Sequence, residues 1–363
     1  MRILVALFFS LCIVFGLEAS KIAKSDRSLW SYPINSPSSF DFASKMEMLV
    51  FVEWINKIEA LNEANLKAFL KIDSISLETI NKFLKNSKEK IALNFKNASL
   101  VDKNDFLPQF ESYEWEDITN LSKYAKENLP KELSQWRENA DIFYQHYIYE
   151  QLRLAAIFPR ITSEILTLDE NEIKGDRIKD KNFILTFDDG PTKIGGNTDK
   201  LIKLLRDLNV KAIFFVLDSS LKNRGNDSSK IYDGFIVGSH GEFHKPHIKK
   251  EIYQNAPKLA NKVKNLGINK DECFFRPPYG QRNIDIVLAL KKSDCKIVLW
   301  NIDSQDWVKN LNQNEMLDRI ITLSLLWRSG IILFHDTNSK SYNILQKYIK
   351  QMQDSNVTFN TNF

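Results

Sequence analysis

The second half of the chain alternates short apolar runs with longer amphipathic stretches. We expect the apolar runs to be β-strands, over residues 183–187, 212–216, 235–237, 274–275, 297–300 and 331–334. Amphipathic stretches predict helices over residues 199–208, 283–292, 315–329 and 343–352, before a last short run at 357–359. Such alternation is typical of parallel strands joined by helices, in an open sheet or a barrel. The pattern predicts an α/β fold from residue 183 to the end.

The first half of the chain has apolar residues at helical spacing instead. One predicted helix begins near Phe42, a second covers residues 77–84, and the longest covers 130–158. Residues 21–168 are therefore expected to form an all-α domain of unknown role. His146 lies among tyrosines there, and core packing is a better explanation than a sugar-stacking patch. Residues 169–182 are highly charged, as expected of a connector between domains.

Residues 1–20 have the pattern of a targeting segment. Arg2 precedes an apolar run that ends at Leu17, and small residues follow at Ala19 and Ser20. The run is short for a full membrane span, so a cleaved signal peptide is expected, with an uncleaved anchor as the alternative. The rest of the chain is then exported, to a periplasmic or extracellular location, free or tethered to a membrane by residues 1–20.

Composition and charge narrow the class of protein. The 363 residues are 43% hydrophobic and 12% aromatic, as in a globular protein. The net charge of +4 is spread along the chain without a basic block, so no nucleic-acid partner is expected. After the targeting segment only Cys273 and Cys295 remain. An exported protein could join them in a disulfide, although two buried thiols are the simpler interpretation.

Polar clusters follow most of the predicted strands. They are Asp188-Asp189, Ser239-His240, Arg276-Pro277 and His335-Asp336, with a fifth at 303–307. Active sites collect at the carboxyl ends of strands both in open α/β sheets and in (β/α) barrels. The recurrence of these clusters predicts an enzyme.

Two of these clusters suggest a metal site. Adjacent carboxylates such as Asp188 and Asp189 are costly unless a cation separates their roles, one binding the ion and the other acting as a base. His240 and His244 are spaced i, i+4, which on a helical turn would direct both rings at one ion. Such a pair is by default two surface histidines without a metal. The clustering of histidines favours a metal site, since four of the five lie from residue 240 onward. His247 is either solvent-facing or a partner of a ligand.

Five motifs occur in order: TFDDGP (186–191), SHGEFH (239–244), RPPYG (276–280), DSQDW (303–307) and LFHD (333–336). From about residue 180 to its end the chain resembles the NodB-homology polysaccharide deacetylases, carbohydrate esterase family 4. Singly, each motif has a structural explanation, such as an ion pair for Arg276 or a core position for Trp307. Their joint order favours the family. The resemblance implies a distorted (β/α) barrel of the NodB type over residues 183–363.

The resemblance also implies a metal centre and two residues that transfer protons. Asp188 matches the family's general base, and Arg276 matches the arginine that orients it. His335 matches the general acid, and Asp303 matches the partner of that histidine. The implied ligands of a divalent metal, usually Zn²⁺, are Asp189, His240 and His244.

Three further residues match the family's substrate-binding positions. The backbone N–H of Tyr279 would help hold the oxyanion, while Trp307 and Leu333 would be the apolar walls around the acetyl methyl group. Two departures occur beside the histidines. Gly241 stands where the family usually has Ser or Thr, and the expected proline is displaced to Pro246. The ligand spacing survives, so metal binding is still expected, with a different loop path.

These matches imply an exported, metal-dependent deacetylase acting on an acetylated polysaccharide. The expected reaction is hydrolysis of N-acetyl groups in an N-acetylhexosamine glycan such as peptidoglycan or an exopolysaccharide. Two alternatives remain, an O-acetyl polysaccharide esterase and a non-catalytic glycan-binding member. Binding alone needs neither Asp188 nor His335, so their presence speaks against the second alternative.

Overall fold

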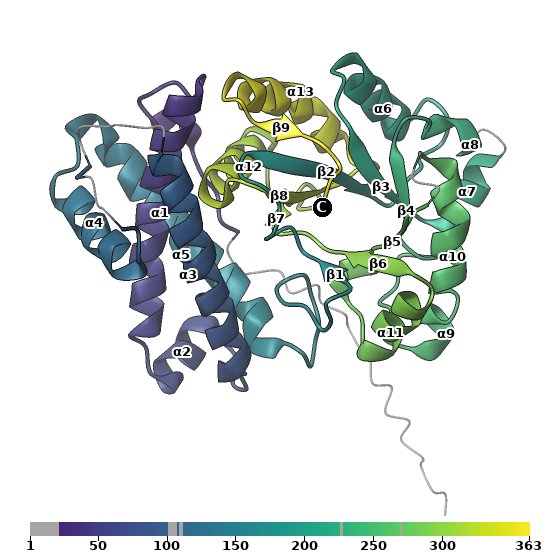
Figure 1. Cartoon of the computed structure of the whole chain (residues 1–363), viewed down its shortest axis with the longest axis horizontal. Helices are drawn as coiled ribbons and strands as arrows, with labels where there is room; N and C mark the ends of the chain where they lie inside the picture. Colours follow the sequence, from purple (N-terminus) through teal and green to yellow (C-terminus); the bar gives the residue numbers. More distant parts are fainter. Residues whose placement is uncertain (1–21, 101–106, 109–111, 226–227, 269–270) are drawn as a thin grey trace, which may run out of the picture.

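The computed structural model describes residues 22–363, apart from 101–106, 109–111, 226–227 and 269–270. A helical region, residues 22–168, lies beside a sheet whose outer side carries further helices (Figure 1). The predicted targeting segment lies outside the described residues. Within the described part of the chain, no helix has the length and apolar character needed to cross a membrane.

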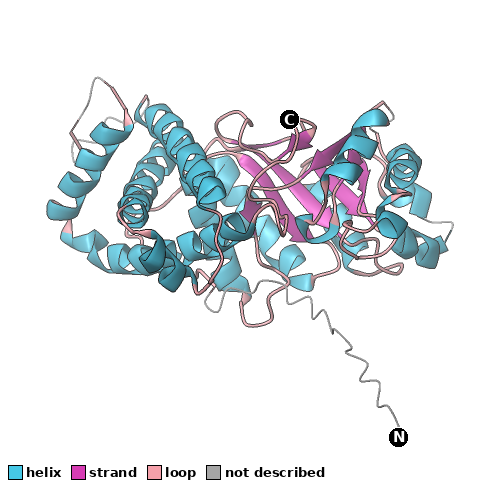
Figure 2. Cartoon of the chain, turned by 90° about the horizontal axis from the view of Figure 1, so that it is seen from below, coloured by secondary structure: helices cyan, strands magenta, loops and turns pink. Residues whose placement is uncertain are grey.

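The helical region is built around one long buried helix. Its helices are α1 (Pro37–Glu59), α2 (Glu63–Leu70), α3 (Leu77–Ser99), α4 (Trp115–Glu127) and α5 (Ser134–Ile157). Ser36 caps α1, with Pro37 at the first helical position. Helix α1 is buried on nearly every face because α3, α4, α5 and α12 (Gln313–Trp327) all pack on it. The helices are seen from below in Figure 2.

The sheet is parallel throughout and is curled into a partial barrel. Its strands are β1 (Glu172–Ile173), β2 (Asn182–Asp188), β3 (Ala212–Val216), β4 (Ile236–Ser239), β5 (Cys273–Phe275), β6 (Cys295–Val298), β7 (Ile302–Asp303), β8 (Gly330–His335) and β9 (Thr358–Phe359). Neighbouring strands follow the order β1-β6-β5-β4-β3-β2-β8-β7, and β9 pairs with β2. Strand β6 pairs with β5, and β7, which follows it after a few residues, pairs with β8. The bend between β6 and β7 curls the sheet, which confirms the predicted distorted (β/α) barrel.

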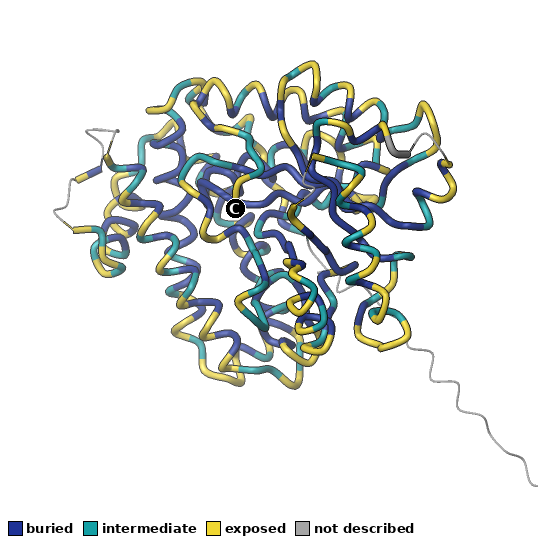
Figure 3. The backbone as a smooth tube through the Cα atoms, turned by 45° about the vertical axis from the view of Figure 1, so that its right-hand side comes forward, coloured by how far each residue is buried: buried dark blue, intermediate teal, exposed yellow. Residues whose placement is uncertain are grey.

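Helices cover the outside of the barrel (Figure 1). They are α6 (Asn197–Asp207), α7 (Asp218–Arg224), α8 (Ser228–Ile231), α9 (Lys250–Tyr253), α10 (Ala256–Val263), α11 (Ile284–Lys292), α12 and α13 (Ser339–Asp354). The barrel interior is filled by Ile184, Ile213, Phe274, Val298 and Ile331 from different strands. In Figure 3 the stretches of chain in the interior are buried, whereas exposed positions lie around the periphery.

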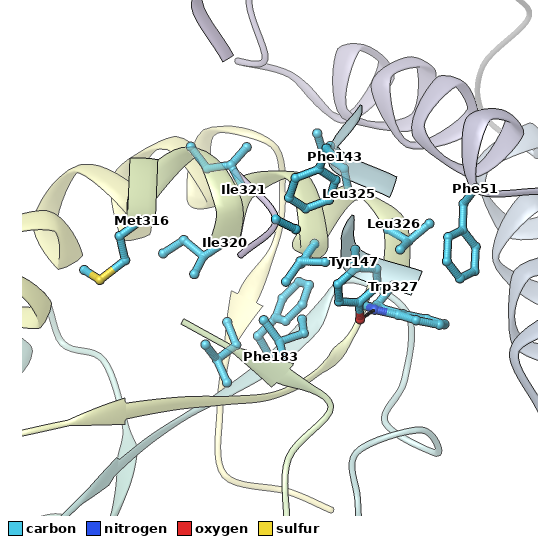
Figure 4. Packing of buried hydrophobic residues seen from close by; sticks show 14 of the residues in the cluster. Phe51, Phe143, Tyr147, Phe183, Met316, Ile320, Ile321, Leu325, Leu326 and Trp327 are labelled. Atoms are coloured by element: carbon cyan, nitrogen blue, oxygen red, sulfur yellow. Dashed lines mark hydrogen bonds between the residues drawn. The ribbon is translucent and has the colours of Figure 1, made fainter. Parts of the chain in front are cut away.

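The helical region and the barrel share one hydrophobic core, with α12 between them. The Phe51 ring meets the Trp327 ring edge-on at 5.7 Å, and the Trp327 indole N–H donates to the Tyr147 hydroxyl at 2.8 Å (Figure 4). A buried ion pair between Arg319 and Glu150, 2.8 Å apart, joins α12 to α5. The two parts therefore form a continuous packed interior. Domain boundaries at 168 and 183 stay a prediction.

The charged segment 169–182 is packed against the barrel and is not a free connector. Strand β1 pairs with β6, and Ile178 joins the barrel interior. The Glu172 carboxylate forms a fully buried ion pair with Arg282. Since charges that end in buried ion pairs resemble solvated ones in a sequence, composition alone suggested a linker here.

Cys273 and Cys295 face each other across β5 and β6 and are joined by a disulfide. The two residues are direct partners in the register of the parallel pair. The interpretation as two free thiols was therefore wrong.

Candidate active site

The carboxyl ends of the barrel strands surround a cavity of about 380 Å³. Of the residues predicted for the site, Arg276 alone does not line this cavity. Those that line it are Asp188, Asp189, His240, His244, Tyr279, Asp303, Trp307, Leu333 and His335. Residues separated by almost 150 positions in the sequence are thus brought to one place by the parallel strands.

Asp189, His240 and His244 form a group that can hold a metal ion. The Oδ1 atom of Asp189 lies 3.6 Å from Nε2 of His240 and 3.6 Å from Nε2 of His244. Ligands bound tetrahedrally at about 2.1 Å are about 3.4 Å apart, so these spacings fit a shared ion. The Asp189 Oδ1 atom is buried and has no hydrogen-bond partner among the described residues.

The tautomer of His240 strengthens this fit. Its Nδ1 lies 2.8 Å from the backbone carbonyl oxygen of Arg276 and must carry the proton to donate there. Its Nε2 is then an acceptor facing the acceptor oxygen of Asp189. Burial lowers the pKa of His240 well below its usual value, which keeps the ring neutral. A cation between the two acceptor atoms would remove their repulsion. A histidine whose other ring nitrogen donates to a backbone carbonyl is also usual for a metal ligand.

The two histidines lie on a loop after β4, not on a helical turn as the i, i+4 spacing predicted. That prediction was wrong because Gly241 has a φ of 90°, which interrupts any right-handed helix. The loop still brings the two rings to 5.3 Å from each other. The Tyr279 ring packs edge-on against His244 at 4.4 Å and supports its orientation.

The same loop explains why glycine replaces the family's Ser or Thr at position 241. A Cβ atom there would lie 2.6 Å from Cε1 of His247. His247 is 1% exposed and packs against the Phe275 ring, so it is not solvent-facing. Burial lowers the pKa of His247 to about 4, and the neutral ring fills the space under the loop.

Asp188 is a buried carboxylate held by a buried arginine. Nη1 of Arg276 donates to Oδ1 of Asp188 at 2.9 Å and to the Thr186 hydroxyl at 2.7 Å. Carbonyl oxygens of Val298 and Leu299 accept the other guanidinium N–H groups. Burial raises the pKa of Asp188 to about 6, against the opposing charge of Arg276. This arrangement gives a base with a fixed orientation.

The partner of His335 is Asp306, not Asp303 as the resemblance implied. Nδ1 of His335 lies 2.7 Å from Oδ1 of Asp306, and Ser341 also donates to this carboxylate. The Asp303 carboxylate instead accepts the N–H of Gln305 at 2.8 Å. Both aspartates belong to the DSQDW motif, so the motif was found but the wrong carboxylate was chosen.

Asp306 keeps His335 charged. Burial disfavours the imidazolium, but the charge and hydrogen bond of Asp306 outweigh it and raise the pKa of His335 to about 10. With Nδ1 engaged by the carboxylate, Nε2 holds the proton that can be transferred. His335 has the protonation state required of a general acid at neutral pH.

The remaining predicted residues lie where a substrate would contact them. Trp307 is 43% exposed and Leu333 is 4% exposed, and both line the cavity. Tyr279 has a φ of 59°, in a short turn that follows β5. One contribution had no signal in the sequence. The helical region also lines the cavity, through α5 and the segment after it.

A possible metal centre, a buried base and a charged histidine at the mouth of a (β/α) barrel define a hydrolytic type of site. A family model described as polysaccharide deacetylase matches residues 175–298. This match confirms the resemblance to the NodB-homology polysaccharide deacetylases that the motifs indicated.

Individual relatives match about half of the chain. The peptidoglycan-N-acetylglucosamine deacetylase PgdA of Listeria monocytogenes is 29% identical over 185 residues, which are 50% of this chain and 38% of the relative. A bifunctional xylanase/xylan deacetylase of Cellvibrio japonicus is 31% identical over 165 residues, 43% of this chain and 24% of the relative. The chain therefore matches less than half the length of these relatives. A solved structure of the Bc1960 peptidoglycan N-acetylglucosamine deacetylase has 25% identity and a TM-score of 0.47, covering 53% of this chain and 90% of that one.

Proposed function

We propose that the chain is an exported, metal-dependent deacetylase that hydrolyses N-acetyl groups of an N-acetylhexosamine glycan, peptidoglycan or an exopolysaccharide. The observation that carries the proposal is the register of two strands. Asp188 on β2 and His335 on β8 are direct partners in the parallel pair. A base and an acid thus end neighbouring strands at one mouth of the barrel, as hydrolysis of an amide requires.

Asp189, His240 and His244 would hold the metal, and a tetrahedral set of nitrogen and oxygen donors suits Zn²⁺. When bound, the ion would polarise the acetyl carbonyl and lower the pKa of a coordinated water toward about 7. The buried, partnerless Oδ1 of Asp189 supports this assignment.

Proton transfer falls to the chain's own residues. Asp188 takes the proton of the attacking water, and Arg276 holds its carboxylate in place. The Tyr279 backbone N–H would stabilise the oxyanion. His335 gives its Nε2 proton to the departing amine, and Asp306, which accepts the Nδ1–H, keeps the imidazolium charged until then. An amine leaves poorly without this proton, so the acid is essential for an amide substrate.

Two other features support the finer parts of the proposal. Trp307 and Leu333 offer an apolar surface for the acetyl methyl group. The disulfide between Cys273 and Cys295 suits an oxidising compartment, which agrees with export directed by residues 1–20.

The test is release of acetate by the purified chain without residues 1–20. The substrates are N-acetylglucosamine oligomers, peptidoglycan and O-acetylated xylan, each with and without a chelator and after reloading with Zn²⁺. We expect release from an N-acetylated glycan, loss with chelator, and recovery with zinc. Asp188→Asn should be inactive. Release from xylan alone would identify an O-acetyl esterase, and no release by the folded, zinc-loaded protein would overturn the proposal.

A further inference from the structure

The cavity at the barrel mouth extends well beyond the residues that handle an acetyl group. Its volume of about 380 Å³ falls in the range of ~300–1,000 Å³ typical of sites that enclose whole small ligands. The metal-binding group and the Trp307–Leu333 surface account for one part of its lining. Much of the rest comes from the helical region, which the resemblance does not cover.

One face of α5 and the segment after it form this second wall. Gln151, Leu154 and Ile157 are three residues apart on α5, so they lie on one face of the helix, and all three line the cavity. Ile161 and Glu164 continue the wall beyond the end of the helix. The wall therefore combines apolar side chains with polar and charged ones, a mixture that suits a specific ligand site.

The wall is rigid because the shared core holds it. Leu152, next to Gln151, is fully buried, and the buried pair of Arg319 with Glu150 anchors the same turn of α5 to α12. Arg153 also faces the cavity and is fixed by the Leu70 carbonyl group. The side chains of this wall therefore have fixed positions relative to the barrel mouth. Their distance from the residues that would bind the acetyl group is set by packing.

Two carboxyl groups meet at the edge of this wall, Glu164 from the wall itself and Asp303 from β7. The pKa of Glu164 is raised to about 7, chiefly by burial and next by the nearby charge of Asp303. Both line the main cavity and also a smaller neighbouring one of about 70 Å³, together with Gln151 and Trp300. Because Asp306 and not Asp303 engages Nδ1 of His335, the Asp303 carboxylate, which accepts one N–H from Gln305, can also bind a ligand. Carboxyl and amide groups beside apolar side chains are well suited to the hydroxyl groups and faces of a sugar ring.

We propose that the helical region forms a subsite for a second sugar residue of the glycan, next to the residue whose acetyl group is hydrolysed. Gln151, Glu164 and Asp303 bind its hydroxyl groups, and Leu154 and Ile157 contact its ring. This inference rests on the proposed deacetylase function and extends it. The chain would then favour an oligomeric glycan over a minimal acetyl substrate, mainly through residues outside the barrel.

The test compares two substrates in each variant, an N-acetylglucosamine tetramer and 4-nitrophenyl acetate, in the zinc-loaded protein. The variants are Gln151→Ala, which is compatible with a helix, and Glu164→Gln, which keeps the shape and removes the charge. Glu138→Gln is the control, because Glu138 is exposed on the same helix and does not line the cavity. The quantity measured is the ratio of kcat/KM for the tetramer to that for the minimal ester.

We expect this ratio to fall about tenfold in each wall variant, equivalent to about 1.4 kcal/mol, mainly through a higher KM for the tetramer. It should stay at the wild-type value in Glu138→Gln. An unchanged ratio, or equal losses on both substrates, would overturn the subsite.

Calorimetric titration of the tetramer separates this inference from the proposed function. If the wild type binds the tetramer and the wall variants bind it about tenfold more weakly, the subsite stands even without turnover. If wild type and wall variants bind it equally, the subsite is wrong whether or not acetate is released.

Discussion

Asp306 binds His335 at two points: Oδ1 lies 2.7 Å from the ring Nδ1, and Oδ2 accepts the backbone N–H of the same residue at 2.7 Å. The carboxylate therefore fixes the ring and the end of β8 together. The serine hydroxyl of α13 that also donates to it leaves the carboxylate fully engaged. Such a carboxylate stays ionised, and burial of the pair strengthens its hold on the imidazolium.

Asp306→Asn should move the alkaline limb of the activity profile to lower pH. Asp306 raises the pKa of His335 to about 10, so the acid is protonated below that pH and is lost above it. Without the negative charge that pKa falls, and deprotonation begins at lower pH. The measurement is kcat against pH, and we expect kcat at neutral pH to fall at least tenfold, as for other general acids. Asp303→Asn is the matched control, and a limb that moved with Asp303 instead would refute the pairing.

His335→Ala should affect amide and ester substrates differently. An amine needs the acid's proton to leave, whereas an alcohol leaves more easily. We expect a loss of about 10²–10⁴-fold in kcat on N-acetylated oligomers and a smaller loss on an O-acetylated substrate. Glycan affinity, measured by calorimetry, should change little. Equal losses on both substrates would argue against an acid role for this histidine.

Removal of one histidine should empty the metal site. The three donors lie close enough to share one ion, and two donors bind it far more weakly. Zinc content measured by atomic absorption after dialysis should be about one ion per chain in the wild type and near zero in His244→Ala. His146→Ala, in the helical region, should retain the metal. Retention of zinc by His244→Ala would place the ion elsewhere.

Gly241→Ala should damage the site more than a comparable change elsewhere. The residue has a φ of 90°, and its new Cβ would press on the buried His247 ring at 2.6 Å. We expect unfolding free energy to fall by about 1–3 kcal/mol and zinc affinity to fall with it. Gly195→Ala has a similar backbone, with a φ of 76°, but open space around the new Cβ. It should show the backbone cost alone, with normal zinc affinity in a metal titration.

Removal of the disulfide should lower stability without changing the site. The bridge closes a loop with a sequence separation of 22, for which the chain-entropy model gives about 3 kcal/mol. Denaturant unfolding of the double variant Cys273→Ser with Cys295→Ser should show this loss. An unchanged midpoint would mean that the two thiols are not joined in the folded protein.

The strands and the catalytic motifs could be predicted because they are local features. Runs such as Ala212–Val216 are wholly buried, so their apolar composition marks them directly. The polar residues that follow each run must meet, since parallel strands end at the same edge of the sheet. Short helices such as α7 and α9 are too brief to show a period and were not predicted.

The features that could not be predicted from the sequence depend on contacts between residues far apart in the chain. The spacing within DSQDW does not tell which aspartate reaches His335, because the answer depends on where β8 lies. The charges of Glu172 and Asp180 look like those of a solvated linker until their arginine partners are in place. Nothing in α5 marks it as a wall of the site, since that role exists only once α12 has seated it against the barrel.

Trp327 contacts the helical region through Phe51 and Tyr147 and ends the helix that leads into β8. Unfolding of the N-terminal half would therefore expose Trp327, which lies a few residues before His335. Heat or proteolysis that unfolds one half should therefore unfold the other half in the same transition. A substitution at this junction in either half would therefore alter the packing of the other half.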